Sequence, residues 1–386
     1  MRRPVLALVS VLLSASFCVH FSGSAFAQGL AALPTALQET TAASHPGKVA
    51  LAAGAVRFEA ADLTTLGVKA GEIATRVWID VKPASGAAAS LDPFVGIAAA
   101  SRDELDLEAA FPGDDKALAQ RMSHAPCIVL TGGTWSDWWV CTNPRHKLTR
   151  LGSAILDAHR RGALVVGVGA SAAYLAEWSV LERSAITRPV RDPHEEGLDV
   201  VAEGLGLVEG VCIDLELGGR TTPSRMLRAT REGNVTLAVW LAGPVVWIDD
   251  AGANTSTVLG PGAALAFDLR TARRDREDIA GGRLSAIVGG VTLDRRALTY
   301  AGPATARSTA AQLPPRDASV PALESARIAA TLATDAIAGP LELCDAIECL
   351  SIALDERSLR VSGSWTNARF DLHAPRQPRE RAGQVK

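Results

Sequence analysis

The chain has 386 residues, a formal net charge of −3, 48% hydrophobic residues and 21% charged residues. These values exclude a disordered chain and a strongly basic nucleic-acid-binding protein. The length predicts about two to three domains with enough sequence to bury a core. Composition therefore favours a soluble α/β protein but does not indicate what the protein does.

The N-terminus has the organisation of a secretory signal peptide. Arg2 and Arg3 precede an apolar run at 5–19, and Ala25-Phe26-Ala27 provides an A-x-A cleavage site before Gln28. We expect residues 1–27 to be removed and the protein to be periplasmic or extracellular; a retained membrane anchor is the alternative. No later apolar stretch is long enough for a membrane span.

Export would permit disulfides. One of the 6 cysteines, Cys18, lies in the signal peptide, so an odd number remains and at least one thiol is free. Cys344 and Cys349 are close enough in sequence to form a local bridge, and Cys212, in an apolar run, is the expected free thiol. No cysteine has the spacing of a zinc ligand, and no motif implies a metal, nucleotide or flavin.

Apolar patterning predicts a three-layer α/β/α sandwich with a mainly parallel sheet. Strands are expected at 76–82, 127–131, 163–167, 207–214, 236–241 and 245–249, and helices at 148–161 and 171–182. We place this domain at 72–270, after a leader or packing segment at 28–71. A charged and Pro-rich linker at 271–321 and a small C-terminal appendage at 322–386 follow.

The most informative segment is Val165 to Ala173, where an apolar strand runs through G-V-G-A-S-A-A into a helix. A serine between small residues in a strand–turn–helix is typical of a nucleophile elbow, with Ser171 as the nucleophile. A serine at a helix N-cap has the same pattern. Upstream, Thr131-Gly132-Gly133 ends another strand, so the N–H of Gly133 could bind an oxyanion; a simple turn is the alternative.

These motifs, in this order, resemble the cyanophycinase-like serine peptidases, which are related to peptidase E and have the class I glutamine amidotransferase-like fold. The resemblance covers about 125–270, where T-G-G, the elbow, G-L-G-L-V with Ile213-Asp214, two spaced arginines and V-x-G-x-G recur in order. It implies hydrolysis of a peptide or isopeptide bond through an acyl-enzyme. The residues implied are Ser171 as nucleophile, Gly133 and Ala172 as oxyanion N–H donors, and Arg220 and Arg225 as substrate-binding residues.

The resemblance fails where the family has its catalytic histidine, because Glu216 occupies that position. A carboxylate is a weak base toward a hydroxyl and repels a forming oxyanion. The family's pocket glutamine is replaced by Trp135. These losses predict lost or altered chemistry, unless His146 or His194, from nearby loops, replaces the base; His159 is expected to be a helix residue.

The cluster of Trp135, Trp138 and Trp139 follows Gly133, where family members contact substrate. Exposed tryptophans would bind a peptide or polyamide substrate or a protein ligand, whereas buried ones would cover the edge of the sheet. The alternative function is therefore a non-catalytic binding or scaffold protein that uses the Trp135–Trp139 loop. Nothing in the sequence indicates an oligomeric state.

Overall fold

Small and branched apolar residues dominate the strands, as expected for strands buried on both faces. The computed structural model describes residues 45–54, 56–82, 92–94, 96–97, 99, 101–105, 107, 113–144, 147–182, 199–215, 223–231, 235–274, 278–296, 341–344, 349–353, 359–361 and 364–373. All of them belong to one compact unit, Ser44–Lys386. The signal peptide predicted at 1–27 lies outside the described residues.

The first sheet has the strand order β15-β11-β10-β1-β5-β4-β2-β3. Its parallel part runs from β1 to β3, and β10, β11 and β15 extend it as antiparallel strands. The bounds are β1 Val49–Ala53, β2 Val77–Val81, β3 Ser101–Leu105, β4 Cys127–Gly132, β5 Leu164–Val168, β10 Val245–Asp250, β11 Thr255–Leu259 and β15 Thr292–Asp294.

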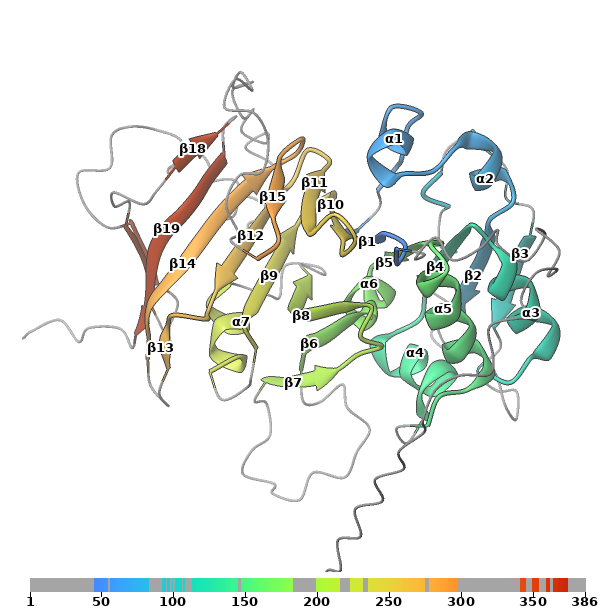
Figure 1. The fold of residues 1–386 in the computed structure, drawn as a ribbon. Helices are drawn as coiled ribbons and strands as arrows, with labels where there is room; N and C mark the ends of the chain where they lie inside the picture. Colours follow the sequence, from blue (N-terminus) through green and yellow to red (C-terminus); the bar gives the residue numbers. More distant parts are fainter. Residues whose placement is uncertain are drawn as a thin grey trace, which may run out of the picture. The chain divides into compact units, whose positions relative to one another are not determined.

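Helices cover both faces of this sheet, which gives the three layers that the sequence predicts (Figure 1). Alternate residues of β1 and β5 pack with α1 and α2 on one face and with α3 to α6 on the other. The helices are α1 Asp62–Leu66, α2 Ala70–Ala74, α3 Lys116–His124, α4 Trp135–Thr142, α5 Arg150–Arg160 and α6 Ala170–Leu175.

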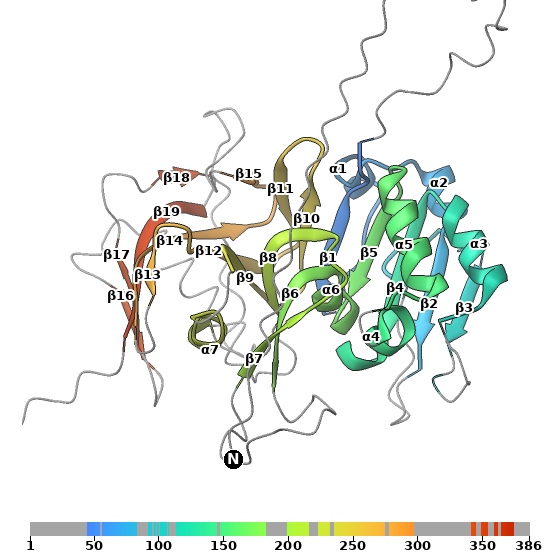
Figure 2. The same cartoon turned by 60° about the horizontal axis from the view of Figure 1, so that its bottom comes forward.

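A second sheet has the order β16-β17-β19-β14-β12-β9-β8-β6-β7, and Figure 2 shows it in another view. Only β6, β8 and β9 are mutually parallel, and α7 packs on this sheet. The bounds are β6 Ala176–Glu182, β7 Asp199–Glu203, β8 Val208–Leu215, α7 Pro223–Ala229, β9 Leu237–Ala242, β12 Ala263–Asp268, β13 Arg273–Arg274, β14 Ile279–Val288, β16 Leu341–Cys344, β17 Cys349–Ala353, β18 Leu359–Val361 and β19 Ser364–His373.

The α/β class is confirmed, and the six predicted strands correspond to β2, β4, β5, β8, β9 and β10. The parallel strands are divided between two sheets, whereas one sheet was predicted. The helix predicted at 171–182 is wrong beyond Leu175, because β6 begins at Ala176 and pairs with β8.

The domain boundaries expected from the sequence do not coincide with the boundaries of the two sheets. The segment expected to be a leader or packing segment contains β1, which lies between β10 and β5 near the middle of the first sheet. The segment expected to be a linker contains β14, which pairs with β12 and β19. The C-terminal strands therefore continue the second sheet instead of forming a separate appendage.

The thiols of Cys127, Cys141 and Cys212 are free and buried. Cys212 is thus free, as expected. Burial raises the pKa of all three thiols, that of Cys141 to about 12, so they remain protonated at neutral pH. In the backbone register of β16 and β17, Cys344 is opposite Cys349, but their side chains lie outside the described part, so the bridge stays a prediction. No helix among the described residues is long and apolar enough to cross a membrane.

A substitution at Phe370 would test whether β19 folds together with the rest of the second sheet. Its ring is fully buried, lies 5.1 Å from the ring of Phe267 and contacts the backbone at Gly282, where a Cβ would be 2.3 Å from the ring. We expect Phe370→Ala to lower the free energy of unfolding by about 3–5 kcal/mol in urea denaturation. The exposed neighbour Arg369 is the control, since Arg369→Ala should change it by less than about 0.5 kcal/mol. A separate early transition of the C-terminal strands would contradict this expectation.

Candidate active site at the strand–helix elbow

The turn between β5 and α6 has the geometry of a nucleophile elbow, with Gly169 at its apex. Strand β5 ends at Val168, and α6 begins at Ala170, so one residue makes the turn. Gly169 has φ 66° and ψ −128°, a conformation that residues with a side chain adopt only under strain. In such elbows the nucleophile is the residue at the strained apex.

Glycine leaves that apex without a functional group, although there is space for one. A Cβ built on Gly169 would meet no atom within 4 Å. At Gly167, two residues earlier, a Cβ would lie 2.7 Å from the Cα of Ala172, so the strand and helix approach too closely for any side chain there. The G-x-nucleophile-x-small pattern is therefore met by Gly167, Gly169 and Ser171, with glycine at the nucleophile position.

Ser171, the predicted nucleophile, is on the first turn of α6 and is fully buried. Its hydroxyl donates to the carbonyl oxygen of Leu130 at 2.7 Å and accepts from the N–H of Val168 at 2.9 Å. The structure thus corrects the assignment by two residues. The N-cap alternative does not hold either, because the N-cap is Gly169 and the Ser171 hydroxyl accepts from Val168, which precedes the helix. The hydroxyl connects the elbow to β4 and has no access to solvent.

The backbone N–H groups of Ala172 and Gly133, the two predicted oxyanion donors, lie in different environments. Ala172 is fully buried, and its N–H donates to the carbonyl oxygen of Gly169 at 2.9 Å, so it is not available to a ligand. Gly133 follows β4 directly, has φ 62° and approaches Val81 closely. Its position at the carboxyl end of β4 is compatible with the prediction that its N–H binds an oxyanion. The N–H that follows the apex belongs to Ala170, which the sequence pattern did not single out.

The predicted tryptophan loop is a helix, α4, whose indoles pack inward. Trp138 is fully buried and donates its indole N–H to the carbonyl oxygen of Gly132 at 2.9 Å, so it cannot contact a substrate. Trp135 and Trp139 are partly buried against the same core, and Trp135 lies edge-on to Tyr174 at 5.5 Å. The alternative in which these residues cover the edge of the sheet is the one the structure favours.

Of the remaining predicted residues, the structure describes only Arg225 and His159. Glu216, Arg220, His146 and His194 lie outside the described residues. Arg225 is on α7, whose buried face belongs to the core cluster of the second sheet, whereas the elbow belongs to another cluster.

His159 is buried at the end of α5, and its carbonyl accepts from Gly47 just before β1. That is the amino-end edge of the parallel strands, opposite the elbow. Burial lowers the pKa of His159, which favours the neutral ring. It is a helix residue, as expected.

A polar group at the carboxyl ends of β2 and β4 explains the threonine of the T-G-G motif. The buried Thr131 hydroxyl donates to Asp80 at 2.9 Å and accepts from the indole N–H of Trp78 at 2.8 Å. Arg102 donates to the other carboxylate oxygen of Asp80 at 2.8 Å and stacks over Trp78. These contacts fix the edge of the sheet next to the elbow, and they satisfy Asp80 on both oxygens.

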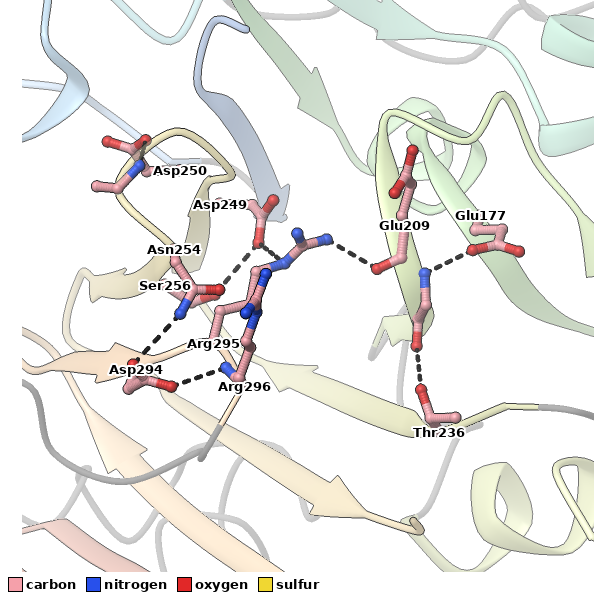
Figure 3. A network of polar contacts seen from close by, with 12 residues as sticks. Glu177, Glu209, Thr236, Asp249, Asp250, Asn254, Ser256, Asp294, Arg295 and Arg296 are labelled. Carbon is pink, nitrogen blue, oxygen red and sulfur yellow. Dashed lines mark hydrogen bonds and ion pairs between the residues drawn. The ribbon is translucent and has the colours of Figure 1, made fainter. Parts of the chain in front are cut away.

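A second polar network, shown in Figure 3, was not predicted from the sequence. Arg295, just after β15, forms an ion pair with buried Asp249 at 2.9 Å and donates to the carbonyl oxygen of Glu209 at 2.8 Å. Ser256 also donates to Asp249. The signals in the sequence were an aspartate pair ending an apolar strand and the Arg295-Arg296 pair, but these two pairs lie far apart in the chain.

Comparisons with known proteins give little beyond this geometry. No protein-family model matches the chain, and no curated protein matches it. Among solved structures, a peptidase from an acI-B1 Actinobacterium is similar over 65% of this chain and 98% of its own, with 13% sequence identity and a TM-score of 0.44. In the described residues, no group of histidine, cysteine or acidic side chains could hold a metal ion.

Ser171→Ala should lower the free energy of unfolding by about 1–3 kcal/mol, because the N–H of Val168 loses its acceptor and the buried carbonyl oxygen of Leu130 loses its donor. Urea denaturation measures this. Ser123→Ala is the control, since the Ser123 hydroxyl is exposed and bonds within its own helix. Equal stability of the two variants would show that the Ser171 hydroxyl has no structural role.

Asp249 should make stability depend on pH. Burial raises the pKa of Asp249 to about 6 against the attraction of Arg295, so the folded state holds this proton more tightly than the unfolded state. The free energy of unfolding should therefore fall as pH rises from about 4 to 6, by on the order of 2 kcal/mol from this group. Asp249→Asn should remove that slope.

Urea denaturation of the wild type and of Asp249→Asn at several pH values between about 4 and 6 measures how far the free energy of unfolding depends on Asp249. Asp250→Asn is the matched control, because Asp250 is partly exposed and pairs with Lys48 at 3.3 Å. If Asp249→Asn kept the wild-type slope, another group would be responsible.

Proposed function

We propose that this chain is an exported homologue of the cyanophycinase-like serine peptidases that has lost peptide hydrolysis. The observation that supports this most directly is Gly169 at the apex of the elbow, where a peptidase of this kind needs a nucleophile. The burial of Ser171, whose hydroxyl bonds to backbone groups on both sides, supports it further.

The sequence around the elbow supports the same proposal. Glu216 in place of the family's histidine would deprive even a correctly placed serine of its base. The family assignment rests on the ordered motifs between 125 and 270, and export rests on the signal peptide at 1–27. A peptide, polyamide or protein ligand remains a proposed partner.

The alternative function keeps the non-catalytic part of this proposal but needs a different recognition surface. The Trp135–Trp139 segment is not favoured, because Trp138 is fully buried and its two neighbours pack against the core. A binding protein built on this fold would have to use other residues.

Labelling with a fluorophosphonate probe tests the loss of the nucleophile. We expect the mature wild-type protein to remain unlabelled, and Ser171→Ala to be equally unlabelled, under conditions in which an active serine hydrolase is labelled. Labelling of the wild type that disappears in Ser171→Ala would overturn the proposal.

The variant Gly169→Ser tests the same proposal by placing a hydroxyl at the apex of the elbow. A Cβ at this position meets no atom within 4 Å, so the backbone conformation is the main obstacle to the substitution, at a cost of about 1–3 kcal/mol. We expect a folded protein by circular dichroism. Labelling confined to this variant would mean that the apex still activates a hydroxyl once one is present.

A further inference from the structure

A cavity of about 390 Å³ lies beside the polar network of Figure 3, away from the elbow. Its walls come from the start of β8 and β9, the turn between β10 and β11, and the residues after β12 and β15. Three arginines, Arg270, Arg295 and Arg296, line it, while Glu209 is the one acidic residue among the described lining residues. Three of the four charged side chains in the described lining are therefore cationic.

Two of the arginines are held in place by carboxylates outside the lining. Arg295 is fixed by Asp249 at 2.9 Å, and the carbonyl oxygen of Glu209 accepts from it at 2.8 Å. Arg270 binds Asp268 through two N–H groups, at 2.8 Å and 2.5 Å. Side chains fixed in this way lose little conformational entropy when a ligand binds.

Arg296 differs from the other two. Its backbone N–H donates to Asp294 at 2.9 Å, and Asn254 donates to the same carboxylate, so its Cα position is fixed. Its side chain is exposed, and within the part of the chain that the structure describes no hydrogen bond or ion pair engages its guanidinium. Of the three arginines, Arg296 is therefore the one whose charge no carboxylate of the described residues pairs with, so it is available to an anionic ligand.

Two neutral donors at the cavity, the Thr236 hydroxyl and the Gly210 N–H, are already used. The Thr236 hydroxyl donates to the carbonyl oxygen of Gly210 at 3.2 Å, and the Gly210 N–H donates to Glu177 at 2.5 Å. Recognition would therefore come from guanidinium groups, whose planar fork matches the oxygens of phosphate and carboxylate groups.

We propose that this cavity binds a small dianionic ligand, such as a phosphate monoester or a short dicarboxylate. Arg296 supplies the free charge, and Arg295 and Arg270 supply oriented N–H groups. The proposal is independent of the elbow and of any loss of catalysis there.

Isothermal titration calorimetry of the mature protein tests the proposal, with inorganic phosphate, glycerol phosphate and succinate at constant ionic strength. We expect saturable binding of at least one of them and an affinity lower by about tenfold or more in Arg296→Gln. The control is Arg160→Gln on α5, which removes the same charge from an exposed side chain far along the chain and should bind as wild type does.

Arg295→Gln is a second variant, checked for folding by circular dichroism because it also breaks the pair with Asp249. Preference for glycerol phosphate over succinate would assign a phosphate ligand, and the reverse a dicarboxylate. Absence of saturable binding, or equal affinity in Arg296→Gln, Arg160→Gln and wild type, would overturn the proposal.

Discussion

The turn from β5 into α6 is the constraint on which the centre of the structure depends. The chain reverses from a central strand into a buried helix through the single residue Gly169, which requires a backbone conformation natural only to glycine. The reversal brings α6 so close to β5 that Gly167 has no room for a Cβ. Ser171 then ties the helix to β4 through Leu130. Helix α6 leads directly into β6, so this one turn also starts the second sheet.

That dependence gives the elbow a structural role that does not require a nucleophile. A hydroxyl that must satisfy two backbone groups in a dry core cannot also attack a substrate, because leaving those groups unpaired would cost free energy. The apex position carries no such obligation, since it faces open space. Packing therefore constrains Gly167 and Ser171, whereas residue 169 is constrained by its backbone conformation alone.

Local patterning in the sequence predicted several elements well. Continuous apolar runs identified β4, β5, β8, β9 and β10, and helical spacing identified α5. The same patterning missed β1, because three of its five residues are alanine and alanine is uncommon in strands. It also extended the helix α6 into β6, because a short apolar run is compatible with both the helical and the strand periodicity. The elbow was placed two residues too late because the serine stood out as a reactive residue. The end of a strand at Val168, which decides which residue is at the apex, depends on pairing that the sequence does not display.

The polar networks were beyond prediction for a different reason: their partners are distant in the chain. Arg295 follows a strand of the first sheet, yet it contacts Glu209 on β8 of the second sheet as well as Asp249 on β10. A guanidinium is suited to this because it presents several N–H groups in one plane and stays charged when partly buried. The group around Asp80 and Thr131 uses its polar atoms internally and so stabilises an edge of the sheet. The arginine group instead lines a cavity and leaves the Arg296 guanidinium without a partner among the described residues, and this difference is the basis for the proposed ligand site.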